Sequence, residues 1–581
     1  MNFANINHCW GSLIIEELSR LGVDYFCVAP GSRSSPLVIP LAQKGLKSFV
    51  HFDERGLAFH AMGYIAATRK PAVIISTSGT AGANFYPAII EASKKKLPLI
   101  VITADRPPEL RQTGAVQTID QVGLYGKYVC WAMDMPCPDT KISPEFVLTT
   151  VAQAWYQALR HHRPVHINCM FRQPLALTAG RENLKTYLKS LDRWAASQKP
   201  YTEYATGFGP APLAVPKKIA ARLQAIKNGV IVVGRLASAE EGGLVVALAE
   251  KLGWPVFADV SSGLRLGHAR GCLIHYFDHL LSSDQLAGKL NFDGVLHLGG
   301  RMTSVRYYDF IQKRRPAEYI MVINHALRND PNHQVTLRVE SGVGHFIQTV
   351  IRFIKARKGS RALKILSKAD EAADRSIEKS FVHDEALSEP RVARLVSQLV
   401  PAGQGLFLSN SMPIRDMANF ADFKGNPVLV NANRGASGID GIIASAAGYA
   451  RGSGRPATLM IGDLAALHDL NSLGMLGALC VPLVIVVLNN AGGAIFSFLP
   501  IAGFKEGFEK FWAAPHSYTL EAAAQMFGLG YRRPMGAGQF KKDYARALGS
   551  RISTVIEVMT NREENLRIHK QLQETIHKVI S

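Results

Sequence analysis

The sequence has few cysteines and lacks a long uninterrupted run of apolar residues. Its seven cysteines are scattered and form no Cys-x-x-Cys pair, which is typical of a reduced protein without a disulfide framework. The longest apolar stretch, from Leu473 to Leu488, is broken by Pro482 and is shorter than the ~18 residues that a membrane helix needs. The first residues, MNFANINHCWGSL, also lack the basic region and apolar core of a secretory signal. We therefore expect a cytoplasmic protein with no membrane-spanning segment.

Acidic residues are in the minority. The chain has 66 Lys and Arg against 46 Asp and Glu, which gives a formal net charge of +20. Such a charge is typical of nucleic-acid-binding proteins, but here the basic residues are spread along the whole chain and accompany no nucleic-acid-binding motif. We therefore expect a solvated basic surface and no nucleic-acid partner. A basic RNA- or DNA-binding protein on a Rossmann scaffold is the remote alternative, which a gel shift measured against salt concentration would test.

At 581 residues the chain is too long for one hydrophobic core, and its 47% hydrophobic and 19% charged residues are those of an ordinary globular protein. Short apolar runs alternate with helical patterns in three successive segments. This alternation predicts an α/β fold with three Rossmann-like domains, each with a mainly parallel sheet flanked by helices. The expected strands are 25–29, 49–52, 72–76, 99–103 and 165–168; then 229–234, 255–259, 294–299, 319–323 and 335–339; and finally 405–408, 427–431, 457–461, 482–488 and 553–558.

The segments between these runs suggest where the domains end. We expect an N-terminal domain at 1–185, a linker at 186–215 that overlaps the stretch PAPLAVP, a central domain at 216–356, a linker helix at 357–389 and a C-terminal domain at 390–581. The first loop of the central domain, Val233-Gly234-Arg235, lacks the complete Gly-x-Gly-x-x-Gly pattern of NAD- and FAD-binding sites. We therefore interpret the central domain as a scaffold.

One strand-helix-strand stretch, within residues 457–500, combines two polar motifs. Its first strand, 457–461, is followed by Gly462-Asp463, and its second, 482–488, is followed by Asn489-Asn490, with a helical pattern at 467–480 between them. A right-handed crossover makes the two strands parallel neighbours, so Asp463 and Asn490 should lie at the same carboxyl edge of the sheet. Either motif alone is better explained as a turn at the end of a strand. The pair in this context instead predicts a functional site.

The chemistry of this site suits a hard cation. Mg²⁺ prefers oxygen ligands at about 2.1 Å, usually shared between a few protein groups, water and substrate phosphates. Asp463 offers a carboxylate, Asn490 an amide oxygen and Gly492 a backbone carbonyl, and Gly493 helps the backbone to approach a bulky anion. We therefore expect these three residues to hold a metal that binds a phosphate-bearing ligand.

Loops that follow the expected strands carry one or two arginines or a glutamate. Glu54 lies at a strand-to-helix junction directly after Asp53, which we expect to be the N-cap of the helix. Arginine is planar and permanently charged, and it therefore suits the binding of carboxylates. For any one arginine, a surface salt bridge is the alternative. The loops are PGSRSSP with Arg33, TADRPP with Arg106, GGRMTSVR with Arg301 and Arg306, SNSMPIR with Arg415 and NRGASGIDG with Arg434.

The spacing from Gly-Asp-x to Asn-Asn resembles the signature of thiamine diphosphate (ThDP) enzymes. In those enzymes the Asp, the second Asn and a backbone carbonyl hold the metal that binds the diphosphate of the cofactor. Leu464 departs from the glycine that many members have at the third position, which points away from the decarboxylase branch. The stretches APGSRSSPL, HFDERG, TSGTA, ITADRPPEL, NRGASGIDG, GDLAALHDLN and NNAGGAIFSFLP, which span residues 29–500, resemble the 2-succinyl-5-enolpyruvyl-6-hydroxy-3-cyclohexene-1-carboxylate (SEPHCHC) synthase family.

This resemblance implies a transferase of menaquinone biosynthesis. In that family, 2-oxoglutarate is decarboxylated on ThDP with Mg²⁺ or Mn²⁺, and the resulting carbanion adds to isochorismate in a Stetter-like 1,4-addition that gives SEPHCHC and CO₂. The family's cofactor lies between the N-terminal, pyrimidine-binding domain of one subunit and the C-terminal, diphosphate-binding domain of another. We therefore expect a homodimer or homotetramer. Another ThDP-dependent 2-oxoacid carboligase or decarboxylase, such as acetolactate synthase, is the alternative, and a substrate panel would separate the two.

The resemblance also assigns roles to individual residues. It implies that Glu54 is the catalytic residue, whose proton acts on the aminopyrimidine ring, and that Ile439 is the apolar residue that bends the cofactor. The family often has Lys-Arg where this chain has Val305-Arg306, so one positive contact would be missing. The implied cofactor-binding residues are Glu54, Ser78, Gly79, Ser411, Ile439, Gly462, Asp463, Leu464, Asn490, Gly492, Ile495 and Phe496, of which Asp463, Asn490 and Gly492 are the metal ligands. The implied substrate-binding residues are Ser32, Arg33, Arg106, Gln117, Arg306, Arg415, Arg434, Phe496 and Leu499.

Overall fold

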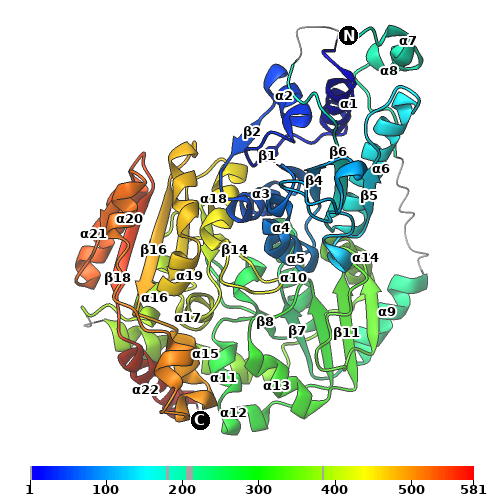
Figure 1. Ribbon diagram of the computed structural model, residues 1–581. Helices are drawn as coiled ribbons and strands as arrows, with labels where there is room; N and C mark the ends of the chain where they lie inside the picture. Colours follow the sequence, from blue (N-terminus) through cyan, green and yellow to red (C-terminus); the bar gives the residue numbers. More distant parts are fainter. Residues whose placement is uncertain (1–2, 178–181, 205–213, 383–384, 581) are drawn as a thin grey trace. The chain divides into compact units, whose positions relative to one another are not determined.

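The computed structural model describes residues 3–177, 182–204, 214–382 and 385–580. These residues form three sheets of six strands each, and neighbouring strands are parallel throughout (Figure 1). The predicted α/β class, with three Rossmann-like parallel sheets flanked by helices, is thereby confirmed. Parts of the expected domain plan lie outside the described residues, namely 178–181 near the end of the first domain, 205–213 in the first linker and 383–384 in the linker helix.

The chain folds into two compact units. The first unit consists of Met1–Gly207, Asn433–Gly454 and Leu467–Val481. The second unit consists of Phe208–Ala432, Arg455–Ala466 and Pro482–Ser581. The first unit therefore contains two segments that are far along the chain from its N-terminal part.

The first unit is built on one sheet with the strand order β2-β1-β3-β4-β6-β5. Side chains alternate along each strand, so Phe26 and Val28 enter the core on one face and Cys27 enters the core on the other. The strands are β1 (Phe26–Val28), β2 (Ser48–Val50), β3 (Ala72–Ser76), β4 (Leu99–Asp105), β5 (Ala132–Met135) and β6 (Val165–Met170). Helices α1 (Ile6–Arg20), α2 (Ser35–Gln43) and α6 (Pro144–His161) contribute to the first core, and α3 (Glu54–Thr68), α5 (Tyr86–Lys95) and α18 (Ile442–Ser453) contribute to the second. The remaining helices are α4 (Thr80–Asn84), α7 (Lys185–Leu188), α8 (Asp192–Ala195) and the 3₁₀ helices η1 (Pro108–Leu110), η2 (Gly126–Tyr128), η3 (Lys189–Leu191) and η6 (Leu470–Ala478).

Helices α3 and α18 pack with their backbones almost in contact. A Cβ atom added at Gly63 of α3 would lie 2.0 Å from the carbonyl oxygen of Ser445, and one added at Gly448 of α18 would lie 1.9 Å from that of His60. Protein interiors are too densely packed to absorb such overlaps. The contact between these helices therefore requires a glycine in each of them.

The second unit contains the other two sheets. The central sheet has the order β12-β11-β10-β7-β8-β9, which is the 3-2-1-4-5-6 order of a Rossmann fold. The C-terminal sheet has the order β14-β13-β15-β16-β18-β17 and thus repeats the order of the first unit's sheet. The strands are β7 (Gly229–Val233), β8 (Val256–Ala258), β9 (Leu273–Ile274), β10 (Gly294–Leu298), β11 (Glu318–Ile323), β12 (Leu337–Glu340), β13 (Gly405–Leu408), β14 (Leu429–Ala432), β15 (Ala457–Gly462), β16 (Leu483–Asn489), β17 (Gly530–Arg532) and β18 (Thr554–Met559).

Helices of the second unit flank both sheets. The central sheet is accompanied by α9 (Ala214–Ala225), α10 (Ala239–Leu252), α11 (Phe277–Leu281), α12 (Asp284–Lys289), α13 (Val305–Arg314) and α14 (Val343–Val350), and the chain continues through α15 (Arg361–Phe381). The C-terminal sheet is accompanied by α16 (Glu389–Leu399), α17 (Met412–Phe420), α19 (Asp463–His468), α20 (Glu521–Met526), α21 (Ala537–Leu548) and α22 (Arg562–Ile580). The short helices are η4 (Val260–Ser262), η5 (Ile351–Phe353), η7 (Ala494–Phe498), η8 (Pro500–Gly503) and the π-helix η9 (Glu509–Ala513).

Two details of the predicted pattern differ from the structure. The five strands expected in each sheet are present, but each sheet has a sixth strand, β5, β9 or β17, that was not expected. The helix expected at 467–480 is wrong: α19 ends at His468, and a 3₁₀ helix follows in that region. Gly474 and Gly477 within it disfavour a regular α-helix. Within the described residues, no helix combines the length and apolarity that spanning a membrane requires.

Candidate functional site

Most of the predicted site residues follow strands at the carboxyl edges of two sheets. In a sheet of order 2-1-3-4, the connections diverge between the first and third strands and leave a crevice there. In the first unit this place lies between β1 and β3, and in the second unit it lies between β13 and β15. Ser32 and Arg33 follow β1, Ser78 and Gly79 follow β3, Ser411 and Arg415 follow β13, and Asp463 and Leu464 follow β15, which ends at Gly462.

The structure brings together the three predicted metal ligands in the second unit. Strands β15 and β16 are parallel neighbours, so Asp463 and Asn490 lie at one sheet edge. Asp463 is 3% exposed, and its Oδ2 accepts hydrogen bonds from the backbone N–H groups of Asn490 at 3.1 Å and Gly492 at 2.9 Å. Burial raises the pKa of Asp463, and these backbone donors oppose the rise. A buried carboxylate is thus fixed beside the amide and the glycine.

The side-chain amide of Asn490 uses its donor but not its acceptor oxygen in hydrogen bonds with the described residues. Its Nδ2 donates to Oε1 of Glu389 at 2.8 Å, and its buried Oδ1 has no hydrogen-bond partner among the described residues. A buried oxygen of this kind normally has a partner, and a cation beside Asp463 would supply one. Burial raises the pKa of Glu389 to about 8. Glu389 was missed in the sequence because no motif marks it.

Gly492 adopts a backbone conformation that favours glycine. Its φ is +149°, and a Cβ atom there would lie 2.4 Å from the carbonyl oxygen of Ala513. His516 lies nearby, with Nε2 at 3.3 Å from Oδ2 of Asp463. Within the described part of the chain, no group of three or more His, Cys, Asp and Glu side chains is arranged to hold a metal. The donor set here is of another kind, with one carboxylate, one amide oxygen and one backbone carbonyl, and it fits Mg²⁺.

The predicted catalytic residue, Glu54, is the first residue of α3 in the first unit. Asp53 is the N-cap, as expected, because its side chain accepts from the backbone N–H groups of Arg55 at 3.0 Å and Gly56 at 3.2 Å. Glu54 is half-buried, and its Oε2 accepts from Nδ2 of Asn84 at 3.3 Å. The capped helix therefore fixes the position of the Glu54 carboxylate at the edge of the sheet.

The loop after β3 is held by a buried amide. Gly79 has a φ of +83°, and its N–H donates to Oε1 of Gln121 at 2.9 Å. Gln121 in turn donates to the carbonyl of Ala104 and to Oδ1 of Asn168. A Cβ atom at Gly79 would lie 3.5 Å from the Cα atom of Gln117, so the structure brings these two predicted residues together. Gln121 lies outside every motif, and no signal in the single sequence marks it.

Two predicted arginines of the first unit lie close together. Arg33 is 6% exposed, and its guanidinium donates to the carbonyl of Phe171 at 2.8 Å. Burial and the neighbouring positive charge of Arg106 lower the pKa of Arg33. The Nε of Arg106 is buried without a hydrogen-bond partner among the described residues. Two partly desolvated guanidinium groups in one place are chemically suited to binding an anion, and Ser32, next to Arg33 in the sequence, is exposed.

The predicted arginines of the second unit both lie near Asp278. Arg306 forms an ion pair with Asp278 at 3.1 Å and is 38% exposed at its side chain. It was expected in a loop, but it lies in the first turn of α13, because Ser304 caps that helix by accepting from the N–H of Tyr307. Arg415 is half-buried, and burial lowers its pKa while Asp278 and a neighbouring carboxylate oppose this effect. Asp278 was missed in the sequence.

The remaining predicted residues lie on loops and on a short helix. Arg434 is half-buried and Ile439 is 38% exposed, and both belong to the loop that leads into α18 in the first unit. In the second unit, Ile495 and Phe496 are half-buried in η7, and Leu499, which follows it, is 46% exposed. The second unit therefore contains both these apolar side chains and the predicted metal ligands.

Comparisons with known proteins agree with this chemistry. Residues 10–124 match a family described as "Thiamine pyrophosphate enzyme, N-terminal TPP binding domain", and residues 185–408 match "Middle domain of thiamine pyrophosphate". A protein of Rubrobacter xylanophilus is 46% identical over 569 residues, which cover 97% of this chain and 98% of that protein. Relatives from Chlorobium phaeobacteroides, at 41% over 586 residues, and Salinibacter ruber, at 40% over 580 residues, cover at least 98% of both chains. All three are named 2-succinyl-5-enolpyruvyl-6-hydroxy-3-cyclohexene-1-carboxylate synthase, and the chain therefore belongs to the SEPHCHC synthase family of ThDP enzymes.

Proposed function

We propose that the protein decarboxylates 2-oxoglutarate and joins the remaining succinyl unit to isochorismate by a 1,4-addition, giving SEPHCHC and CO₂ in menaquinone biosynthesis. The observation that carries this proposal is the adjacent pair Arg33 and Arg106, whose partly desolvated guanidinium groups suit substrates with several carboxylates. Acetolactate synthase and other ThDP-dependent 2-oxoacid enzymes are the second candidate. They account for the metal site but not for the number of arginines at the sheet edges.

A direct test mixes the protein with ThDP, Mg²⁺, 2-oxoglutarate and isochorismate. We expect CO₂ release together with an adduct of the mass of SEPHCHC, detected by mass spectrometry. A parallel panel replaces 2-oxoglutarate with pyruvate. Turnover of pyruvate alone, without a product from 2-oxoglutarate, would favour the acetolactate-synthase type of reaction.

We also propose that Asp463, Asn490 and the carbonyl of Gly492 hold Mg²⁺ or Mn²⁺ and, through it, the diphosphate of the cofactor. When bound, ThDP supplies the nucleophilic carbon and the electron sink that decarboxylation needs. Glu54 holds a proton at the aminopyrimidine nitrogen and so selects the ring tautomer that acts as a base. The further cofactor contacts are Ser78, Gly79, Ser411, Ile439, Gly462, Leu464, Ile495 and Phe496.

The substrate carboxylates are bound by Arg33, Arg106, Arg306, Arg415 and Arg434, with Ser32 and Gln117 as polar contacts. Phe496 and Leu499 provide apolar surface that limits the access of water. Asp278, which is paired with Arg306, competes with a substrate carboxylate for that arginine. The single basic residue at this position, with Val305 exposed before it, therefore contributes less positive charge than the Lys-Arg pair expected from the family.

The arginines give a prediction about substrate affinity. Removing one partner of a desolvated charge pair costs on the order of 2 to 5 kcal/mol, whereas an exposed pair contributes little. Each Arg→Ala variant at positions 33, 106, 415 and 434 should reduce kcat/KM for a carboxylate substrate by more than about tenfold in steady-state assays. The control is Arg172→Ala, because Arg172 also follows a strand but forms an exposed ion pair with Glu109. Near-wild-type efficiency in all four variants would contradict a polycarboxylate pocket.

We propose that the active protein is a homodimer or homotetramer in the cytoplasm. We also propose that the domains and linkers of the chain meet near residues 185, 215, 356 and 389. If Glu54 and Asp463 of one site come from different chains, mixing inactive Glu54→Gln protein with inactive Asp463→Ala protein should restore part of the activity after subunit exchange. Light scattering on the active wild-type protein gives its mass, and a monomer at full activity would contradict the oligomer.

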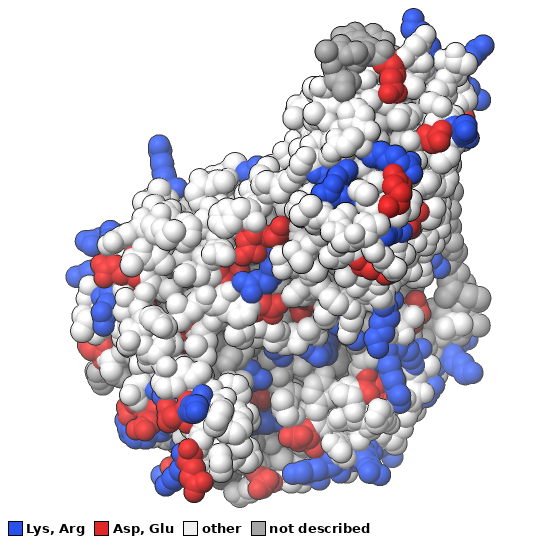
Figure 2. Space-filling model, viewed as in Figure 1, with Lys and Arg blue, Asp and Glu red and all other residues white. Residues whose placement is uncertain are grey.

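A nucleic-acid partner is not part of the proposal. Figure 2 shows basic side chains interspersed with acidic ones over the visible face. A solvated surface accounts for this distribution, because a phosphate-binding surface concentrates its positive charge in one patch or stripe. Absence of a salt-sensitive gel shift would agree with this interpretation.

A further inference from the structure

The carboxylate of Glu91 binds three successive backbone amides of another segment. Glu91 lies on α5 in the first unit and is 3% exposed. Its Oε1 accepts from the N–H of Gly435 at 2.6 Å, and its Oε2 accepts from those of Ala436 at 2.5 Å and Ser437 at 3.2 Å. Hydrogen bonds to an ionised acceptor are roughly twice as strong as neutral ones, and successive N–H groups that converge in this way form an anion-binding nest. Here the anion is a side chain of the protein itself.

The segment that Glu91 binds is the loop 433–441, which carries Arg434 and Ile439 and leads into α18. The loop approaches α5 so closely that a Cβ atom at Gly435 would lie 2.6 Å from the carbonyl oxygen of Glu91. Ser437 has a φ of +67°, a conformation that non-glycine residues rarely adopt. The loop is therefore held in a strained shape that the hydrogen bonds to Glu91 must maintain.

A second contact fixes the start of the loop. Nζ of Lys95, one turn after Glu91 on α5, donates to Oδ1 of Asn433 at 3.3 Å. Nδ2 of Asn433 donates in turn to Oγ of Ser445 on α18 at 2.9 Å. The loop is thus connected to α5 at its first residue and again at 435–437.

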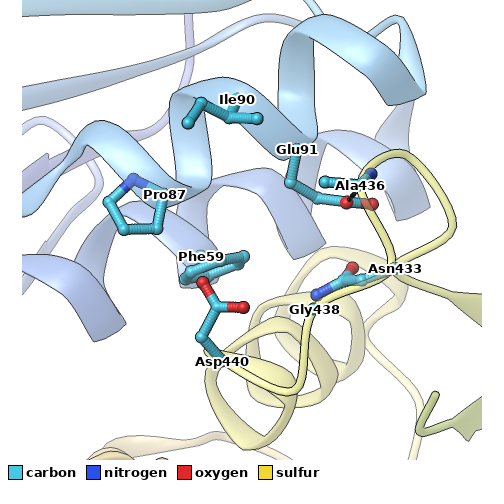
Figure 3. Close-up of a pocket in the computed structure, with 8 residues that line it drawn as sticks. All are labelled: Phe59, Pro87, Ile90, Glu91, Asn433, Ala436, Gly438 and Asp440. Atoms are coloured by element: carbon cyan, nitrogen blue, oxygen red, sulfur yellow. Dashed lines mark hydrogen bonds between the residues drawn. The ribbon is translucent and has the colours of Figure 1, made fainter. Parts of the chain in front are cut away.

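The loop 433–441 and the helices α3 and α5 do not pack against each other everywhere. A cavity of about 190 Å³ lies between the loop and the helices (Figure 3). In Figure 3 the Glu91 side chain points from its helix to the loop at Ala436, beside the cavity. Side chains that line this cavity have fewer protein neighbours on that side. The cavity is lined by Phe59, Pro87, Ile90, Glu91, Asn433, Ala436, Gly438 and Asp440.

We propose that Glu91 is a positioning residue for the reaction: its carboxylate fixes the loop 433–441 and so places Arg434 for a substrate carboxylate and Ile439 for the cofactor. This inference rests on the proposed function, which assigns those two roles. Glu91 itself touches neither substrate nor cofactor. It acts through the backbone of the loop.

The first test uses the protein without substrates or cofactor. Glu91→Gln keeps the size of the side chain but replaces one acceptor oxygen with an NH₂ group that faces backbone donors. Hydrogen–deuterium exchange of the amides at 435–437, followed by mass spectrometry, should become at least about tenfold faster than in the wild type. The control is Lys94→Gln on the exposed face of the same helix, which should exchange like the wild type. Unchanged exchange in Glu91→Gln would overturn the inference, whatever the protein's activity.

The second test asks whether the effect on catalysis passes through Arg434. Glu91→Gln should lower kcat/KM for the carboxylate substrates by about tenfold or more, and most of this loss should disappear when Arg434 is already Ala. The same change in an Arg33→Ala background should keep its full effect. Equal losses in both backgrounds would contradict positioning of Arg434 and indicate a general effect on the fold. If circular dichroism shows that Glu91→Gln is unfolded, Glu91→Asp takes its place in the same cycle.

The two tests also separate this inference from the proposed function. A wild-type protein that does not turn over 2-oxoglutarate and isochorismate refutes the proposed function, while the exchange experiment still decides whether Glu91 holds the loop. An active wild type in which Arg434→Ala has no effect refutes the role of Arg434 and, with it, the positioning of Arg434 by Glu91.

Discussion

Glu54→Gln should bind ThDP with near-wild-type affinity and lose almost all turnover. An amide cannot hold the proton that Glu54 is proposed to share with the aminopyrimidine nitrogen, and general acid–base groups contribute roughly 10²- to 10⁴-fold to rates. The fold should tolerate the change, because the glutamine oxygen can still accept from Asn84 and the N-cap at Asp53 is untouched. Isothermal titration measures cofactor affinity. NMR of the exchange of the thiazolium proton for deuterium measures activation of the bound cofactor.

The control for this variant is Glu109→Gln, a surface glutamate of the same unit that pairs with Arg172. It should exchange the thiazolium proton as fast as the wild type and turn over at the same rate. Wild-type exchange in Glu54→Gln would remove Glu54 from its catalytic role. Loss of ThDP binding in that variant would instead indicate that the glutamate mainly supports the structure.

Asp463→Ala should abolish the metal-dependent part of ThDP binding, with a loss of affinity of at least about 100-fold. The substitution removes the only carboxylate of the proposed donor set. It also leaves the N–H groups of Asn490 and Gly492 without the acceptor that orders them. Asp463→Asn keeps the size of the side chain and separates the loss of charge from the loss of packing. Titration of ThDP at increasing Mg²⁺ concentrations gives the linkage between metal and cofactor.

The matched control is Glu564→Gln, an exposed carboxylate of the second unit in the first turn of α22. Chelation of the metal in the wild type should reproduce the weak ThDP binding of Asp463→Ala, whereas chelation should change little in the variant itself. Equal dependence on Mg²⁺ in the wild type and in Asp463→Ala would refute the proposed metal ligands.

The sequence allowed the central strands of all three sheets to be predicted, because these strands are buried on both faces and appear as continuous apolar runs. The three strands that were missed each lie at one edge of a sheet. They have four, two and three residues, and β5 and β17 are partly exposed. Strands this short contain too few residues to show a clear apolar run or an alternating pattern, so their sequences resemble those of loops.

The predicted site depended on short motifs within continuous stretches. Asp463 and Asn490 could be placed side by side because one strand-helix-strand unit joins them. Glu91, Gln121 and Asp278 could not be found in this way. Each acts on a segment that is distant in sequence, and a single sequence carries no record of which distant residues are neighbours. Arg306 was predicted to lie in a loop, whereas Ser304 caps a helix that already includes Arg306.

The close contact between α3 and α18 has a consequence for how the protein is made. The two helices belong to the same compact unit, but several hundred residues separate them in the chain, including the entire central sheet. At synthesis rates of about 5 to 20 residues per second, α3 leaves the ribosome tens of seconds before α18 exists. During that interval the small-residue face around Gly63 has no partner. The first unit therefore completes its fold only late in translation, after α18 has been synthesised.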